Sequence, residues 1–278
     1  MSSTSIDLAF LIILSLLPAL FWSLFLLQKR MYKEPFIVLI FAFLLGGLAT
    51  IPPLLVRFTS ASVPLYLIPV AILPILTILF AAALEEMSKH SGAMFAMHQD
   101  LRAMDERTDG IVYGIVVGLG FAFVENAVYL WSTYLSQGIS PTFWYIFAIR
   151  SLVTMVAHAL FSGTFGYFYG ISYIRPNTDY VNSSPLRVNL GSLVRSISLR
   201  NFFLFATRTI WSRRKKGVYN FNALEVLFEG YLIVILLHSF FNVILSLPAL
   251  QNMVFLILIP FLFFLGNLLF IPFVRKYT

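Results

Sequence analysis

The chain of 278 residues contains no cysteine, and only 11% of its residues are charged. The lack of cysteine excludes disulfide bonds, cysteine-ligated zinc, iron–sulfur clusters and catalysis by a thiol. Soluble domains carry a charged fraction of about 25%, so this low value excludes an ordinary soluble fold. Any chemistry must therefore come from a small number of ionisable side chains in apolar surroundings.

The sequence is rich in long apolar runs. Hydrophobic residues make up 59% of the chain, and the mean hydropathy is +0.87. Several runs reach the roughly 20 residues that a helix needs to cross about 30 Å of hydrocarbon. We therefore expect an all-α, polytopic transmembrane helical bundle of about seven spans, or eight, with a polar site buried in its core.

The expected spans form a single membrane domain, residues 1–278, whose functional motifs fall within residues 81–247. The spans cover approximately residues 7–27, 35–56, 63–97, 110–134, 143–173, 223–247 and 254–274. Basic residues follow the first, third, fifth and seventh spans. Of the loops that follow the second, fourth and sixth spans, only the first carries a basic residue, Arg57. By the positive-inside rule, this alternation places the N-terminus outside and the C-terminus in the cytoplasm.

Residues 175–219 form one long polar connection between two expected spans. It holds nine of the nineteen lysines and arginines and a single acidic residue, Asp179. Apolar residues and arginines interleave in its second half, which predicts an amphipathic segment on the membrane surface with anionic lipid as the partner of residues 187–216. Nucleic acid is not expected as a partner of a basic run that lies between two spans.

A strip of small residues is predicted on the fourth span, where Gly110, Gly114 and Gly118 recur at every fourth position. Residues at this spacing share one face of a helix. Small side chains on one face let two helix backbones approach closely in lipid. We therefore expect this face to pack tightly against a neighbouring span.

The stretch Ala81–His90, AAALEEMSKH, places charge inside an apolar run. A charged side chain near the bilayer centre costs at least roughly 2.5–3.5 kcal/mol and by default marks a functional site. On a helix, Lys89 falls between Glu85 and Glu86, so it can pair with either carboxylate and leave the other free as a general base. His90 and the later His98 lie near the predicted helix end and are expected to be solvated.

Other ionisable residues occur at similar depth in the later spans. Glu125 lies in the fourth span, His158 in the fifth, and His238 in the sixth with Asn242 one turn further on. Arg150 is expected to neutralise a buried carboxylate or to extend to the surface. Together with Glu85 and Glu86, these side chains predict one polar constellation inside the bundle.

Three chemistries can use such a set of residues. Carboxylate and imidazole groups can activate water for attack on a peptide carbonyl, with Asn242 as a hydrogen-bond donor. A divalent cation such as zinc could do the activation, with Glu86, Glu125, His158 and His238 as its ligands, so the cofactor is either absent or a single cation. The same groups could form a proton or cation path in a transporter.

The motifs taken together resemble the PrsW family of intramembrane proteases and, more distantly, the CAAX prenyl endopeptidases and bacterial immunity-type membrane proteins. They are Glu85-Glu86-x-x-Lys89, Asp109-Gly110-x-x-Tyr113-Gly114, Gly118-x-Gly120-Phe121-Ala122-x-x-Glu125-Asn126, His158 and His238-x-x-x-Asn242. The resemblance implies a glutamic-type or metal-dependent endopeptidase of a bacterial or archaeal plasma membrane. Its substrate would be a membrane-anchored protein, such as an anti-sigma factor.

The resemblance also implies roles for individual residues. Glu85 and Glu86 would activate water, and Glu125 would occupy the place of a histidine in the CAAX enzymes. His158, His238 and Asn242 would complete the site, with Lys89, Asn126 and Arg150 in support. Two alternatives remain at this point: a proton- or cation-coupled transporter, and a non-catalytic membrane scaffold of the same family.

Overall fold

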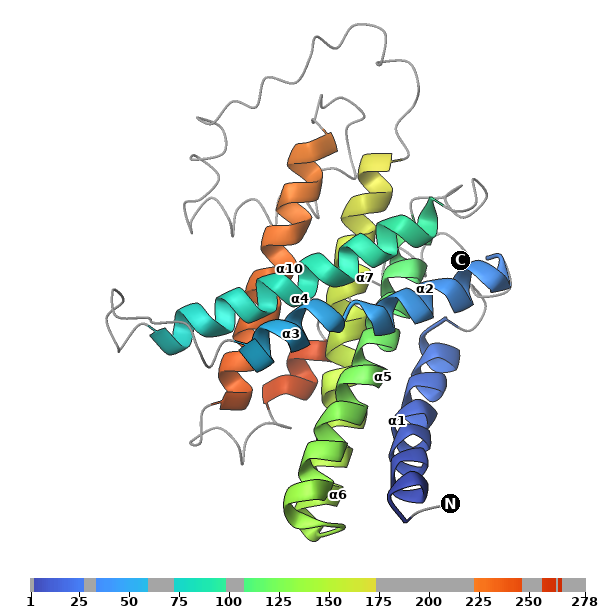
Figure 1. The fold of residues 1–278 in the computed structure, drawn as a ribbon. Coiled ribbons are helices and arrows are strands. Elements are labelled where there is room, and N and C mark those ends of the chain that lie inside the picture. The colour runs from blue at the N-terminus through green and yellow to red at the C-terminus, as the bar shows by residue number, and fades with distance from the viewer. Residues whose placement is uncertain are drawn as a thin grey trace, which may run out of the picture. The chain divides into compact units, whose positions relative to one another are not determined.

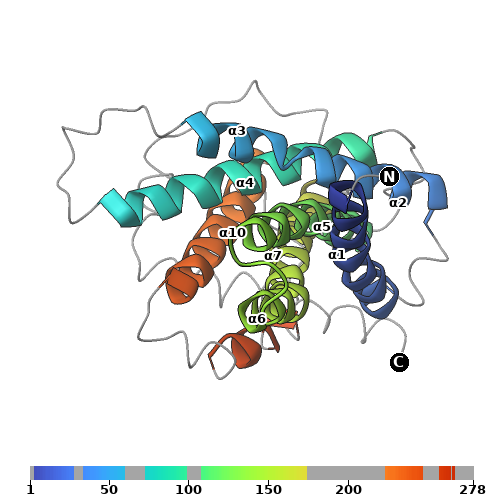
Figure 2. The same ribbon diagram turned by 60° about the horizontal axis from the view of Figure 1, so that its bottom comes forward.

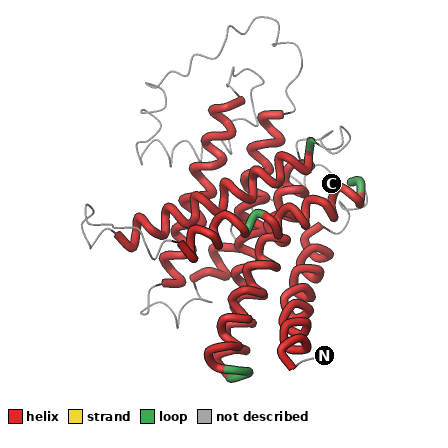
Figure 3. Tube along the Cα trace, viewed as in Figure 1, coloured by secondary structure: helices red, strands yellow, loops and turns green. Residues whose placement is uncertain are grey.

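Helices account for nearly all of the residues that the computed structural model describes, and none of those residues is in a strand (Figure 3). The described residues are 3–27, 34–59, 73–98, 108–173, 223–246, 257–263 and 265–266. The expected all-α membrane fold is thereby confirmed. The chain divides into two compact units, one of residues 1–174 with 226–278 and the other of residues 175–225. The predicted amphipathic segment falls outside the described residues.

The principal helices follow the expected spans closely, with local breaks. They are α1 (Ser3–Leu27), α2 (Phe36–Leu48), α3 (Ile51–Thr59), α4 (Leu73–Met97), α5 (Asp109–Gln137), α6 (Pro141–Ile149), the π-helix η3 (Arg150–Thr154), α7 (Met155–Tyr173) and α10 (Ala223–Ser246). Gly138, with a φ of 64°, ends α5. Ser140 caps α6 by accepting a hydrogen bond from the Phe143 N–H, and Pro141 occupies the first helical position.

Five segments of the described chain are long and apolar enough to cross a membrane. They are Asp7–Phe25, Phe36–Arg57, Asp109–Gln137, Pro141–Ser172 and Val226–Ser246. These segments correspond to five of the seven expected spans. The third expected span contains α4, whose charged residues make it too polar to count on composition alone, and most of the seventh lies outside the described residues.

Two of the expected spans are interrupted. The second, expected over residues 35–56, is broken at Ala49 and Thr50, and Pro52 and Pro53 lie in the first turn of α3. Proline is tolerated there because a first-turn N–H has no intrahelical partner. The fifth is divided by η3, and π-helical turns are frequent at functional sites.

Helix α5 lies at the centre of the described fold. In two views, α2, α3 and α4 run across the group formed by α5, α7 and α10, and α1 lies beside α5 (Figures 1 and 2). The first half of α5, residues 109–122, is buried throughout. Its position between helix layers explains why its sequence is apolar on every face and rich in glycine.

The glycine strip of α5 packs against the backbone of α7, as the sequence predicts. A Cβ at Gly118 would lie 2.5 Å from the His158 carbonyl oxygen, and one at Gly114 would overlap the Ser162 carbonyl. A contact of that length with backbone cannot be relieved by a side-chain rotation. The close packing of α5 on α7 therefore sets the position of His158 relative to α5.

Candidate active site

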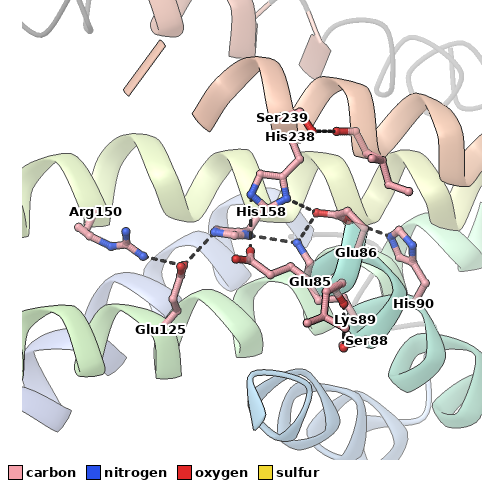
Figure 4. A network of polar contacts seen from close by, with 12 residues as sticks. Glu85, Glu86, Ser88, Lys89, His90, Glu125, Arg150, His158, His238 and Ser239 are labelled. Atoms are coloured by element: carbon pink, nitrogen blue, oxygen red, sulfur yellow. Dashed lines mark hydrogen bonds and ion pairs between the residues drawn. The ribbon is translucent and has the colours of Figure 1, made fainter. Parts of the chain in front are cut away.

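Polar side chains from α4, α5, η3, α7 and α10 meet in one chain of contacts in the interior of the bundle (Figure 4). Among the expected site residues, those brought together are Glu85, Glu86, Lys89, Glu125, Asn126, Arg150, His158 and His238. They come from segments that are far apart in the sequence, from Glu85 on α4 to His238 on α10. The convergence anticipated from their similar depth is therefore present in the fold.

Glu86 is the centre of the buried half of this network. Its Oε1 lies 2.5 Å from the Lys89 Nζ and 2.6 Å from the His238 Nδ1, and all three side chains are 0–2% exposed. A buried carboxylate is tolerated when it is paired and hydrogen-bonded. Because the carboxylate can only accept, His238 donates from Nδ1 and, when neutral, carries its lone pair on Nε2.

His158 lies between Lys89 and Glu125. The Lys89 Nζ is 3.1 Å from His158 Nδ1, and His158 Nε2 is 3.0 Å from the Glu125 Oε2. An ammonium group has no acceptor, so Nδ1 accepts and the proton of a neutral ring sits on Nε2, from which it is donated to Glu125. Lys89 also lies 4.8 Å from the centroid of the Phe121 ring, which offers a cation–π contact.

Arg150, the first residue of η3, binds the same Glu125 oxygen that His158 contacts. Its Nη2 donates to the Glu125 Oε2 at 2.6 Å and its Nε to the Asn126 Oδ1 at 2.7 Å. The Asn126 amide in turn donates to the Arg150 carbonyl at 3.2 Å. Arg150 thus neutralises a partly buried carboxylate, which is one of the two roles expected for it, and Asn126 contacts both the side chain and the backbone of Arg150.

Two lone pairs face each other at the centre of the site. The Glu85 Oε2 is buried, has no hydrogen-bond partner among the described residues, and lies 3.6 Å from the His238 Nε2. Glu86 directs the lone pair of His238 toward that oxygen, as the tautomer above requires. Such a pair of acceptors is unfavourable in a buried place unless a cation or a proton lies between them.

Exposure divides the network into a closed side and an open side. The side chains of Glu86, Lys89 and His90 are fully buried, whereas Glu125, Glu85 and Arg150 are 16%, 15% and 11% exposed. Among the described residues of the network, Glu85, Glu125 and Arg150 therefore form the side that a substrate could approach.

Two expectations for individual residues, those for His90 and Asn242, come out differently. His90 was expected to be solvated, and this is wrong: it is fully buried, because α4 lies across α7 and α10 and encloses this face. His98 is exposed, as expected. Asn242 is half-buried one turn beyond His238, and no contact with the polar network is found for it among the described residues. Its expected role as a hydrogen-bond donor therefore gains no geometric support.

The residues that could hold a metal ion differ from the expected set. Donor atoms of Glu85, His158 and His238 lie within 4.8 Å of one another. Glu86 was expected among the ligands, but its Oε1 is engaged by Lys89 and His238. Glu125 was also expected, but its Oε2 is engaged by Arg150 and His158. The sequence could not distinguish Glu85 from its neighbour, because both carboxylates approach His238, and only the fold shows that Glu85 meets its Nε2 and Glu86 its Nδ1.

The donor set fits a zinc-type cation. One carboxylate and two imidazoles are a common set of three protein ligands in catalytic zinc sites, and a carboxylate on the remaining N–H of a ligand histidine is the usual second contact. Glu85 and His238 present free lone pairs. His158 would have to exchange its contact with Glu125 or Lys89 to join them.

Fold and site together define a helical membrane protein with a buried carboxylate–imidazole centre suited to hydrolysis. Residues 34–199, more than half of the chain, match the family model described as "PrsW family intramembrane metalloprotease". The chain therefore belongs to the PrsW family. No solved structure matches it significantly.

Curated relatives agree with this assignment. The chain is similar to proteins named "Protease PrsW" from Geobacillus kaustophilus, with 33% identity over 53% of this chain and 60% of the relative, and from Oceanobacillus iheyensis, with 31% identity over 59% and 68%. A third, from Clostridioides difficile, is 30% identical over 59% of this chain and 65% of the relative. The match thus spans about three fifths to two thirds of these relatives' lengths.

Proposed function

We propose that this protein is a metal-dependent intramembrane endopeptidase that hydrolyses a peptide bond of a membrane-anchored protein. The observation that carries the proposal is the buried Glu85 oxygen facing the His238 Nε2 at 3.6 Å, with His158 beside them. Family membership supports proteolysis, and the description of the family as metalloproteases supports a metal. By resemblance, the substrate class includes anti-sigma factors anchored in a bacterial or archaeal plasma membrane.

In this proposal, Glu85, His158 and His238 hold a divalent cation such as zinc. A bound zinc ion acidifies a water molecule and polarises a carbonyl group. Glu86 keeps His238 in the tautomer that binds metal, and Lys89 offsets the charge of Glu86. Glu125, partly exposed and held by Arg150, is placed to take up a proton from an attacking water.

The glutamic-type alternative uses the same geometry without a metal ion. Glu85 would then be the general base, since its Oε2 is unengaged and its side chain is on the open side. The two mechanisms predict different effects of metal removal: cleavage is lost in the metal-dependent mechanism and retained in the glutamic one. A transporter is less well supported, because Glu86 and Lys89 are fully enclosed among the described residues.

The test uses the full chain purified in detergent, with fluorescein-labelled casein and a single-pass membrane protein as probe substrates. We expect about one zinc ion per chain, loss of cleavage with 1,10-phenanthroline, and recovery when zinc or cobalt is returned. Glu85→Gln and His238→Ala should lower both metal content and cleavage by at least about 100-fold. His98→Ala, which changes an exposed histidine, is the matched control and should retain both.

Full activity in a metal-free, chelator-resistant protein would overturn the metal-dependent mechanism and leave the glutamic one. Full cleavage by Glu85→Gln would overturn both. A protein that cleaves neither substrate but moves protons or cations into liposomes would be a transporter and not a protease. In that case Glu125→Gln should abolish the transport.

A further inference from the structure

His90 is a fully buried histidine that the proposed mechanism does not use. It lies one turn after Glu86 on α4. Its ring stacks on Phe165 of α7, with centroids 3.7 Å apart and planes at 12°, and meets the Tyr231 ring of α10 edge-on at 5.1 Å. Three helices therefore fix the position and the plane of this imidazole.

The polar atoms of His90 point to a role beyond packing. Its Nε2 is 3.2 Å from the Glu86 Oε2, which is near enough for a charge-assisted contact although it is not aligned as a hydrogen bond. Neither that oxygen nor either ring nitrogen has a hydrogen-bond partner among the described residues. Burying an imidazole between aromatic rings costs free energy unless its N–H finds an acceptor. Among the described residues, Glu86 is the acceptor within reach.

The other carboxylate oxygen of Glu86, Oε1, orients His238. It accepts from Lys89 and His238, and the His238 contact directs the His238 lone pair toward Glu85. A carboxylate is planar and rigid, so a donor that fixes one oxygen also fixes the other. His90 can therefore restrain the orientation of His238 without touching it.

We infer that His90 is a positioning residue, which holds Glu86 so that His238 keeps its Nε2 directed at the Glu85 carboxylate. The part of this inference that concerns metal binding rests on the proposed function. Among the described residues, His90 meets Glu86, Phe165 and Tyr231, none of which belongs to the candidate ligand set of Glu85, His158 and His238. A phenyl ring would preserve its stacking but not its N–H.

The experiment compares His90→Phe with His90→Gln in the full chain, and uses His98→Phe, directly after the end of the same helix, as the matched control. Cobalt affinity is measured by chelator competition and the cobalt site by its visible absorption spectrum. The imidazole nitrogens are followed by NMR of metal-free protein with ¹⁵N-labelled histidine. Because the chain has four histidines, each signal can be assigned by a single substitution.

We expect His90→Phe to keep a thermal midpoint near that of the unsubstituted protein, because the aromatic stack is retained. Its cobalt affinity should fall by about 10-fold or more, its cobalt spectrum should change, and its His238 Nδ1 signal should shift. His90→Gln, which retains a donor, should recover part of the affinity. His98→Phe should change none of these.

Unchanged cobalt binding and an unchanged His238 signal in His90→Phe would overturn the inference, and His90 would be a packing residue. Equal losses in His90→Phe and His90→Gln, with an equal fall in thermal midpoint, would overturn it as well. If the unsubstituted protein binds no cobalt, the metal-dependent function fails, and the His238 signal in metal-free protein alone decides whether His90 positions Glu86.

Discussion

At the scale of single residues, the site depends on a buried ion pair. Glu86 and Lys89 are 0% exposed and 2.5 Å apart. Breaking such a pair by removing one partner is expected to cost about 3–5 kcal/mol, because it leaves an uncompensated buried charge, whereas removing both partners costs less. Their main contribution is therefore to keep His238 and His158 oriented rather than to stabilise the fold as such.

A double-mutant cycle tests this interpretation. We expect Glu86→Gln and Lys89→Met each to lower the thermal midpoint in detergent strongly, and the double substitution to lower it by clearly less than the sum. The coupling should amount to about 0.5–3 kcal/mol. Ser88→Ala, which removes only a hydrogen bond to the Leu84 carbonyl on the same helix, is the control and should have a small effect. Additive effects would mean that the two charges do not stabilise each other.

The sequence predicted which residues gather in the site better than it predicted their partners. Charge in an apolar run is conspicuous, so Glu85, Glu86 and Lys89 could be selected from composition alone. Which carboxylate Lys89 pairs with depends on which face of α4 meets α7 and α10, and this is a tertiary property. His90 was misjudged for the same reason, although its position one turn after Glu86 was a usable signal.

At the scale of elements, the packing of α5 on α7 decides where His158 lies. The sequence predicted the small-residue face of α5, because a four-residue repeat of glycine is a local pattern. It gave no sign of η3, because the apolar run from Pro141 to Tyr173 is continuous and contains no internal proline. Arg150, the first residue of η3, is bonded to Glu125 and Asn126 of α5, and such contacts with another helix cannot be read from a local pattern.

Gly118→Ala tests the packing of α5 on α7. The added methyl group would overlap the His158 backbone, so we expect a loss of about 1–3 kcal/mol in stability, and lower cleavage because His158 is displaced from Glu125. Gly92→Ala on α4 is the matched control, since its Cβ would meet Leu45 at an ordinary 3.4 Å or more. It should be neutral or slightly stabilising, because alanine favours helix.

Equal behaviour of the two glycine variants would contradict this account. The two variants are compared by their thermal midpoints in detergent and by their rates of cleavage of the labelled casein. A Gly118→Ala protein that is destabilised but fully active would show that α5 and α7 pack closely without fixing the position of His158.

At the scale of the whole molecule, the membrane topology depends on α4. The positive-inside rule places residues 175–219, with nine basic residues, in the cytoplasm only if the segment containing α4 crosses the membrane. If α4 did not cross, every later loop would change sides, and the most basic loop would lie outside. Yet α4 is too polar to be selected as a span by composition, because it carries the site.

The absence of cysteine makes this question accessible to experiment, since each introduced thiol is unique. We expect Ser60→Cys and Ser136→Cys to react with a membrane-impermeant maleimide on intact cells. Met104→Cys and Ser184→Cys should react only after the cells are permeabilised. This pattern follows from the alternation of basic loops, with the segment from Ser60 to Met104 crossing once.

Labelling of both Ser60→Cys and Met104→Cys from the same side would show that α4 does not span. The charged residues of α4 would then have to be supplied to the site from a re-entrant helix, which is tolerated at membrane depth only where protein or water surrounds it.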